Sequence, residues 1–504
     1  MSLLGLDIGT TGCKATVFST DGHLLASAYE EYDVQRPQPG WAELDVHAVW
    51  QKIKQTIQQV ASKVKTDPPT ALAVSSLGEA TVPVTPDRQI LGPSLLNFDS
   101  RGEEYLPHLV QILPNERLYQ INGNTLGNNY SLTKLLWLKQ HQPDLYARAD
   151  KFLHWGSFVP FMLGADPAVD YSLANRTLLF DLDKATWSDE LLALVQLDRD
   201  KFPPTVPSAT VIGEVSPHLA QEFGLPPQVT IVSGAHDQCA NAIGCGVIDE
   251  GQAMYGMGTY LCATPVFKRR RDPASMMARG LNTEHHADPH LFASFIYNHG
   301  GSLLKWYRDT FAAAETQPAR AAGRDIYADL IAEMPPGPSG VLALPHFAQT
   351  GPPQFVADSC GVIAGLRLET PRGQILKGIL EGVTFYLRET LDTLPGIGLE
   401  ITDFRAVGGG SKSDAWVQLS ADILGCSFTR PQITEAGALG AAIMAGVGTG
   451  VYASFEEGCQ LTVKPDKVFE PDPAKQRLYD GWFDKYRRLW PLLADYLREI
   501  ASGA

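Results

Sequence analysis

The sequence predicts a mixed α/β protein built from two large domains. Its 504 residues are too many for one core, because a domain typically holds about 100–200 residues. The chain opens with three predicted strands, a helix and a fourth strand, an order typical of mixed α/β layers. The strand, Gly-Thr turn and strand at 3–19 recur at 251–266, which favours two related domains facing each other across a cleft. We place the boundary in the polar connection 245–252 and divide the chain into 1–247 and 248–504.

The elements of the opening segment follow from the spacing of apolar residues. Alternating or continuous apolar residues predict strands at 3–9, 14–20 and 24–34, joined by tight turns as in an antiparallel meander. Apolar residues in steps of three and four predict an amphipathic helix at 46–64. The run at 70–78 predicts a buried strand.

Later segments alternate in the same way. An apolar strand at 228–233 runs into a Gly-Ala-His-Asp turn, and a helix of small residues that can approach a neighbour closely is expected after it at 238–247. Helices are also expected at 131–142, where Pro143 ends the pattern, and at 189–197, with Ser188 as N-cap. In the second half we expect a long helix at 372–394, a strand, triple-glycine turn and helix at 403–416, a small-residue helix at 438–451, and a helical tail at 472–502.

Composition excludes several classes of protein. The 41 Lys and Arg against 56 Asp and Glu give a formal net charge of −15, which argues against a general nucleic-acid binder but not against a nucleotide substrate. No run of about 18 apolar residues predicts a membrane span, and the first residues do not resemble a secretory signal. The seven cysteines include no C-x-x-C pair, so we expect buried thiols in the cytoplasm.

The turn after the first strand has the chemistry of a phosphate site. Gly9 lets the backbone approach an anion closely, and the Thr10 and Thr11 hydroxyls with nearby N–H groups can donate to phosphate oxygens. Asp7, at the strand end, can hold Mg²⁺, which prefers carboxylate and water oxygens. The alternative is an ordinary hairpin turn. Neither a P-loop nor a G-x-G-x-x-G dinucleotide motif is present.

The second half supplies two further glycine turns. Gly258 and Thr259 repeat the phosphate-turn chemistry, so two hairpin turns can clamp one polyphosphate from both sides. Gly408 to Gly410 lie between a strand and a helix, where bare backbone can take a flat adenine or ribose; a close strand–helix crossing is the alternative. Ser411 and Ser413 can contact the nucleoside or cap the helix, and the sequence does not separate these roles.

Asp237 is the candidate general base. It follows an apolar strand, and its carboxylate can take the proton of a substrate hydroxyl that attacks phosphorus. The alternative is an N-cap of the helix that follows, a role that would stabilise the anion and weaken the base. The adjacent His236 is a rival base.

Together these segments resemble the FGGY family of carbohydrate kinases over nearly the whole chain. The resemblance implies a two-domain actin/Hsp70/hexokinase-type (ribonuclease H-like) fold with a central cleft, and ATP- and Mg²⁺-dependent phosphorylation of a sugar or polyol hydroxyl. It places the catalytic base on Asp237 and the first phosphate and metal site on Asp7 to Thr11 with Lys14. It places the second phosphate turn on Gly258 and Thr259, and the adenosine site on Gly408 to Gly410 with Ser413. The segments that carry it are LDIGTTGCKATVFS, DYSLANRTLLFDL, GAHDQ, GMGTY, LPHFAQTGPPQFVADSCGVIAGL, AVGGGSKSDAWVQLSADILG and EAGALGAAIMAG.

The segments expected around the sugar depart from the family patterns. Where xylulokinases carry Gln-Met-His and glycerol kinases Arg-Glu, this chain has Gly78 and Glu79, so only Glu79 matches the glycerol type. Asp99 and Arg101 fit the W-x-D-x-R pattern without its Trp, and QTGPP lacks the usual Arg. Glu79 can accept hydrogen bonds from vicinal hydroxyls, or be a surface carboxylate. The residues expected to contact the substrate are Gly78, Glu79, Asp99, Asp237 and Gln238.

The overall pattern favours a pentulose such as D-xylulose as the acceptor. Glycerol or another short polyol is the alternative substrate. A non-catalytic sugar or nucleotide sensor on the same fold is the alternative of another class, although a sensor would not need both Asp7 and Asp237. We allow for a homodimer, which the sequence does not test, and expect no nucleic-acid or membrane partner.

Overall fold

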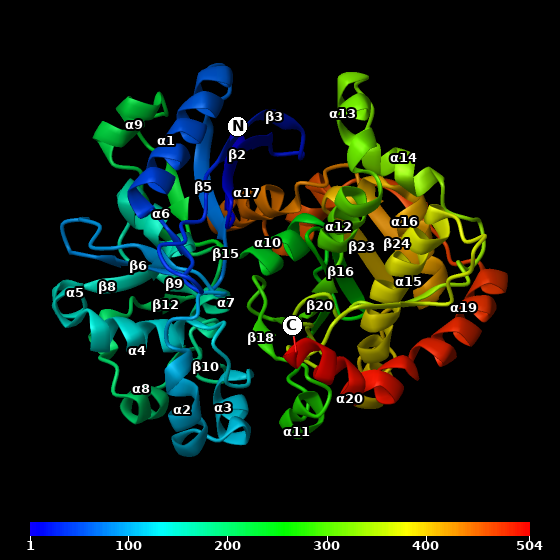
Figure 1. Cartoon of the computed structure of the whole chain (residues 1–504). Coiled ribbons are helices and arrows are strands. Elements are labelled where there is room, and N and C mark those ends of the chain that lie inside the picture. Colours follow the sequence, from blue (N-terminus) through cyan, green and yellow to red (C-terminus); the bar gives the residue numbers. More distant parts are fainter. Residues whose placement is uncertain (504) are drawn as a thin grey trace.

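Two lobes, each built on one mixed β-sheet, form the molecule in the computed structural model, which describes residues 1–503 (Figure 1). The first sheet has the order β13-β14-β5-β1-β2-β3, and β15 also pairs with β5. Strands β1, β2 and β3 form an antiparallel meander, β5 is parallel to β1, β14 and β15, and the edge strand β13 is antiparallel to β14. The strands are β1 (Ser2–Ile8), β2 (Gly12–Ser19), β3 (Leu24–Glu31), β5 (Pro69–Ser76), β13 (Val211–Glu214), β14 (Thr230–Val232) and β15 (Ala235–His236).

The second sheet repeats this topology. Its central strand pairs antiparallel with the next strand of a meander and parallel with the strand on its other side, as β1 does between β2 and β5. The order is β18-β19-β17-β16-β23-β24-β25, with β20 also on β17. The strands are β16 (Gln252–Met257), β17 (Tyr260–Phe267), β18 (Glu284–His285), β19 (Phe292–Ala293), β20 (Ile296–His299), β23 (Asp403–Val407), β24 (Ser427–Pro431) and β25 (Pro465–Phe469). The predicted two-domain α/β fold with a repeated meander is confirmed.

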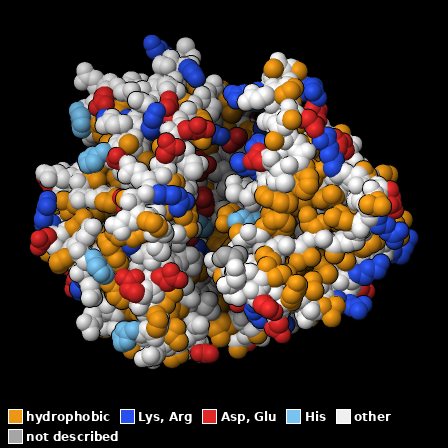
Figure 2. Space-filling view, in the orientation of Figure 1, with side chains coloured by type: hydrophobic (Ala, Val, Ile, Leu, Met, Phe, Trp, Pro, Cys, Tyr) orange, Lys and Arg blue, Asp and Glu red, His pale blue; other side chains and the backbone are white. Residues whose placement is uncertain are grey.

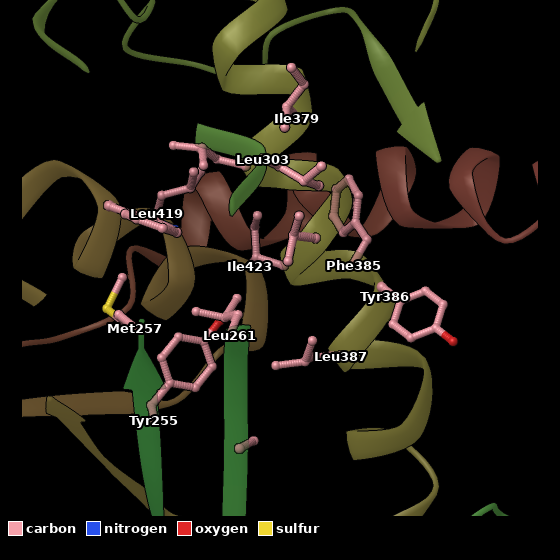
Figure 3. Packing of buried hydrophobic residues seen from close by; sticks show 14 of the residues in the cluster. Tyr255, Met257, Leu261, Leu303, Ile379, Phe385, Tyr386, Leu387, Leu419 and Ile423 are labelled. Carbon is pink, nitrogen blue, oxygen red and sulfur yellow. The ribbon is translucent and has the colours of Figure 1, made fainter. Parts of the chain in front are cut away.

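Helices cover both faces of each sheet. Alternate residues of β1 face opposite ways: Leu4 and Leu6 join the core under α1 (Val46–Lys63), and Leu3 faces the core that contains α17 (Ala436–Gly448). In the second lobe Tyr255 and Met257 pack with α15 (Arg372–Leu391) and α16 (Asp414–Leu424) (Figure 3).

The remaining helices form the outer parts of both lobes. Pro143 ends α4 (Ser131–His141) as predicted, but it also starts α5 (Pro143–Arg148), because proline suits the first turn of a helix. The predicted helical tail is two helices, α19 (Pro473–Tyr486) and α20 (Leu489–Ser502). No helix among residues 1–503 is long and apolar enough to cross a membrane. These helices include α3 (Asn115–Asn122), α4 (Ser131–His141), α5 (Pro143–Arg148), α6 (Trp155–Leu163), α7 (Tyr171–Asn175), α8 (Asp189–Val195), α12 (Gly301–Phe311), α14 (Ile326–Ala332), α19 (Pro473–Tyr486) and α20 (Leu489–Ser502).

Two helices of small residues lie between the lobes. They are α10 (Asp237–Gly244) and α17, which packs on β1 and β5 although it belongs to the second half of the sequence (Figure 1). Glycines allow this contact: a Cβ on Gly440 would lie 1.9 Å from the Ala240 carbonyl oxygen, and one on Gly244 would lie 1.8 Å from that of Ala436. The lobes are therefore in backbone contact at this point. The boundary between residues 247 and 248 stays a proposal.

Gly440→Ala is expected to destabilise the protein. Alanine normally stabilises a helix interior relative to glycine, but here its methyl group would overlap backbone, so a loss of about 1–3 kcal/mol is expected. The measurement is the thermal unfolding midpoint. The matched control is Gly481→Ala in α19, where a Cβ would meet nothing within 4 Å; it should stabilise the protein by about 0.5–1 kcal/mol. Equal midpoints for the two variants would contradict the packing described here.

Candidate active site

The carboxyl ends of three neighbouring strands bring together the two predicted acidic residues. In β1, β5 and β15, which run parallel, Asp7 pairs with Ser75 and His236 with Ser76. Asp237 follows β15 directly, so it and Asp7 lie at the same sheet edge on either side of β5, roughly 10 Å apart, or two strand spacings. The carboxyl edge of such a sheet is where ligands of open α/β folds bind.

The surroundings of Asp7 disfavour the charged form of its carboxyl group. Burial raises its pKa to about 6, and the negative charge of Asp237 contributes in the same direction. The Ser75 hydroxyl donates to Asp7 Oδ1 at 2.7 Å and lowers the pKa in part. Lys14, another predicted site residue, pairs with Glu435 at the start of α17, so its ammonium group is only in part available to Asp7. The excess of negative charge near Asp7 favours a cation.

Asp237 forms a close pair with His236. His236 Nε2 lies 3.0 Å from Asp237 Oδ1, and the Asp237 side chain remains 30% exposed. Burial alone would raise the pKa of Asp237, but the charge of His236 outweighs it and the pKa is lowered. Burial would lower the pKa of His236, and Asp237 raises it above the usual value. The helix α10 starts at Asp237, and no side chain caps it, so the N-cap alternative is wrong.

A tyrosine hydroxyl holds the first glycine turn by hydrogen bonds to its backbone. Gly9 N–H donates to the Gly12 carbonyl at 2.9 Å, closing the turn between β1 and β2. The Tyr32 hydroxyl is placed to donate to two backbone carbonyl oxygens, that of Gly9 at 2.6 Å and that of Gly12 at 3.0 Å. Thr10 is half-buried and Thr11 exposed. The hairpin geometry is confirmed, and the binding of phosphate stays a prediction.

Tyr32→Phe is expected to raise the KM for ATP roughly fivefold. Removing the hydroxyl costs one hydrogen bond of about 1 kcal/mol and leaves the turn less well ordered for an anion. Steady-state kinetics with varied ATP measure the effect. The KM for the acceptor should stay within a factor of two; a larger change in it than in the KM for ATP would contradict the assignment of this turn to the nucleotide.

The second glycine turn lies against the start of a helix. Gly301 N–H donates to the Gly258 carbonyl at 2.9 Å, and Ser302 N–H donates to the Thr259 carbonyl at 3.1 Å, so the first residues of α12 hold the turn. Gly258 and Thr259 are both exposed. A Cβ on Gly301 would lie 2.4 Å from the Gly258 carbonyl oxygen, which explains the glycine there.

The triple glycine adjoins this second turn. Gly408 has φ +86°, and a Cβ on Gly410 would meet Met257 and Trp416 within about 3 Å. Met257 ends β16 directly before Gly258, and β23 ends directly before Gly408; because β16 and β23 are neighbours in the sheet, the two glycine segments lie side by side. Nothing lies within 4 Å of a Cβ position on Gly409, so open space adjoins it. The Ser413 hydroxyl accepts from Trp416 N–H at 3.3 Å, which confirms its capping role; its contact with a nucleoside stays a prediction.

The predicted sugar side contains an arginine that the sequence analysis did not select. Glu79 is buried, so it is not a surface carboxylate, and Arg176 Nε donates to its Oε1 at 2.9 Å. Arg176, at the end of α7, also pairs with Glu284 of β18. A Cβ on Gly78 would lie 2.9 Å from the His236 ring and 3.2 Å from Arg176 Cγ. The available signal was one charge in the otherwise small and apolar stretch around 172–180.

Asp99 and Gln238 complete the predicted substrate residues. Asp99 is buried, and its carboxylate accepts from the Ala42 and Arg101 N–H groups at 2.5 and 2.7 Å and pairs with the Arg101 guanidinium at 2.6 Å. These contacts serve the fold, and a substrate role for Asp99 stays a prediction. Gln238 is half-buried beside Asp237. Figure 2 shows acidic side chains inside the hollow between the lobes.

The two lobes share one sheet topology, each carries a glycine turn after its first strand, and two acidic residues lie at one edge of the first sheet. Residues 2–244 match the N-terminal domain of the FGGY family of carbohydrate kinases, and residues 256–449 match the C-terminal domain. The chain therefore belongs to the FGGY family of carbohydrate kinases, ATP-dependent enzymes that phosphorylate an alcohol group.

Curated relatives span almost the whole chain. A xylulose kinase of Bacillus subtilis is 25% identical over 99% of this chain and 99% of its own. A gluconokinase of Bacillus licheniformis is 27% identical over 99% and 96%, and a glycerol kinase of Stenotrophomonas maltophilia is 28% identical over 95% and 96%. The crystal structure of a xyloylose kinase from Brucella ovis superposes with a TM-score of 0.87 at 26% identity, over 98% of this chain and 100% of that one. These relatives support a sugar kinase and leave the sugar open.

Proposed function

We propose that this protein transfers the γ-phosphoryl group of ATP to a hydroxyl of a small sugar, with a pentulose such as D-xylulose as the leading acceptor. The observation that carries the proposal is the placement of Asp237 at the sheet edge it shares with Asp7, between lobes that each carry a glycine turn. Relatives named xylulose kinase support the choice of pentulose.

Asp237 is the proposed general base. Its carboxylate accepts the proton of the acceptor hydroxyl while that oxygen bonds to the γ-phosphorus and ADP leaves. The lowered pKa of Asp237 keeps it ionised at neutral pH. His236, with its raised pKa, is protonated more readily than a free histidine and is a poorer base at neutral pH. We therefore assign base chemistry to Asp237 and a charge-balancing, orienting role to His236.

Asp7 is the proposed residue for Mg²⁺. Mg²⁺ commonly binds through one or two carboxylates together with substrate phosphates, and it neutralises phosphate charge. The residues fit, because Asp7 is a half-buried carboxylate with a raised pKa, and the negative charge of Asp237 adds to the field that favours a cation there. Among residues 1–503 no group of three or more His, Cys, Asp or Glu can hold a metal ion, which agrees with a site that the nucleotide completes.

The glycine turns are the proposed nucleotide site. The turns at Gly9 to Thr11 and at Gly258 and Thr259 present backbone N–H groups and hydroxyls to the phosphates. The open space beside Gly409 suits the adenosine. Closure of the two lobes would exclude water, which otherwise competes with the sugar as acceptor.

A glycerol-type acceptor is the second candidate, and one observation favours it. Glycerol kinases carry Arg-Glu where this chain has Gly78 and Glu79. Here the guanidinium of Arg176 pairs with Glu79 and lies next to Gly78, so an arginine and a glutamate meet at this place although position 78 is not Arg. The test is ATP turnover with a panel of xylulose, other ketoses, glycerol and longer polyols. Faster turnover with glycerol than with xylulose would replace the pentulose. Binding without turnover for every compound would favour a sensor.

Cytoplasmic location and a homodimer are further proposals. All seven cysteines are free among residues 1–503, which suits a reducing compartment. Size-exclusion chromatography with light scattering tests the dimer.

A further inference from the structure

Arg176 joins the two lobes inside the cleft. It lies at the C-terminal end of α7 in the first lobe and pairs there with Glu79, which follows β5. Its other terminal nitrogen pairs with Glu284 of β18, in the sheet of the second lobe. All three side chains are at least nine-tenths buried. Neither Arg176 nor Glu284 takes part in the phosphoryl-transfer chemistry proposed above, and Glu284 has so far been given no role.

We propose that Arg176, Glu79 and Glu284 form an acceptor-binding subsite that spans both lobes and selects a neutral polyol or ketose over a sugar acid. The proposal rests on the proposed kinase function and names the chemical class of its acceptor. Arg176 acts as a hydrogen-bond donor and the two carboxylates as acceptors for hydroxyl groups.

The local sequence makes room for this arginine. With no side chain at Gly78, Arg176 Cγ and the His236 ring occupy space that a Cβ would enter at 3.2 and 2.9 Å. The Tyr130 ring lies 4.8 Å from the Arg176 guanidinium carbon and the Phe295 ring 5.8 Å from it, so aromatic faces from both lobes hold the cation. His236 connects this cluster to Asp237, since its ring lies beside Gly78 and 3.0 Å from the Asp237 carboxylate.

One oxygen of this cluster lacks a partner. Glu284 Oε1 accepts from Asn282 Nδ2 at 2.7 Å and from Arg176, whereas Glu284 Oε2 is buried with no hydrogen-bond partner among the described residues. A buried carboxylate oxygen without a donor is costly. A substrate hydroxyl at this point satisfies it, because a hydroxyl donates a proton, whereas a carboxylate at the same point has no proton to donate at neutral pH.

The charge of the cluster points the same way. Three carboxylates, on Glu79, Glu284 and Asp237, face one guanidinium and one imidazole. The cluster is therefore negative even when His236 is protonated. In a buried site a further negative charge is repelled strongly, whereas a neutral polyol adds none. One of the relatives is named a gluconokinase, and gluconate would bring a carboxylate here.

A purely structural bridge between the lobes is the competing explanation. Such a bridge exists elsewhere: Arg270 Nη1 lies 2.7 Å from Asp183 Oδ1, and Arg270 Nη2 donates to the Gln120 carbonyl at 3.0 Å, which also links the second half of the chain to the first. Asp183 is 70% exposed. Arg270→Gln therefore removes a contact between the lobes without changing the proposed subsite, and it is the matched control.

The first experiment compares acceptors. Xylulose, glycerol and gluconate are assayed with the full-length protein and Mg·ATP by ADP release. We expect kcat/KM for at least one neutral compound to exceed that for gluconate by 100-fold or more. Gluconate as the best acceptor would overturn the subsite and leave the kinase function standing. No turnover with any acceptor would instead count against the kinase function itself.

The second experiment tests the named residues. Glu284→Gln should raise the KM for the best neutral acceptor about tenfold, change the KM for ATP by less than twofold, and narrow the discrimination against gluconate about tenfold, because one negative charge is gone. Glu79→Gln should act in the same direction and serves if the first variant does not fold. Arg270→Gln should change none of these values. If the two glutamine variants bind acceptors and discriminate as the unaltered protein does, the bridge is structural and the proposal fails.

Discussion

Asp237→Asn is expected to lower kcat by about 10³-fold, in the range typical of losing a general base. Asparagine keeps the size of the side chain but cannot take the proton of the acceptor hydroxyl. The start of α10 should be unaffected, since no side-chain cap is lost. The affinity for the sugar, measured by the quenching of tryptophan fluorescence or by calorimetry, should change little. Rapid-quench measurement of one turnover separates this loss of chemistry from any slow release of product.

His236→Asn is the comparison that assigns the base. The lowered pKa of Asp237 means that it loses its proton below its usual range and stays a carboxylate as the pH rises through neutrality. The raised pKa of His236 means that it holds its proton to higher pH than a free histidine. We therefore expect a smaller loss for His236→Asn than for Asp237→Asn at pH 7.5. The reverse order, with near-normal turnover in Asp237→Asn, would move the base to His236.

Local sequence patterns predicted the parts of the site that a single strand and its turn determine. The strands before Gly9 and Gly258, the turn after β23 and the helix after Asp237 all follow from apolar runs that stop at glycine or at a polar residue. The small-residue helix after Asp237 was predicted to approach a neighbour closely, and Gly244 does so against Ala436. These features depend on short stretches of sequence, or on one helix face that carries only small side chains.

Features that depend on pairing between distant segments could not be predicted in this way. Arg176 and Glu284 lie more than 100 positions apart, and nothing near either residue shows that the lobes bring them together. The sequence did not decide whether Glu79 is buried or exposed, because its burial depends on how α7 packs against it. The packing of α17 on the first sheet is also a tertiary contact. Its small residues allow a close neighbour, but they do not tell which element that neighbour is.

Asp7→Asn is expected to reduce kcat/KM for ATP by roughly 100-fold or more, because a Lewis-acid contact to the phosphates supplies several kcal/mol in related chemistry. The residual activity should require much higher Mg²⁺. A titration of activity with Mg²⁺ at fixed ATP measures this shift. The same variant should be as stable as the unaltered protein at pH 7.5, or more stable.

The stability follows from the sign of the pKa shift. Burial raises the pKa of Asp7 from its ordinary value of 3.8 to about 6. As the pH rises through this interval, the unfolded chain ionises before the folded one does, so the free energy of unfolding falls and the protein becomes less stable. A neutral asparagine removes that loss.

Asp45→Ala gives the opposite result: it removes the N-cap of α1, where Asp45 Oδ1 accepts from Ala48 N–H at 3.0 Å. That change should cost about 1 kcal/mol of stability and leave the kinetics unchanged. An Asp7→Asn protein that loses stability and keeps its activity would show that Asp7 supports the fold and does not hold Mg²⁺.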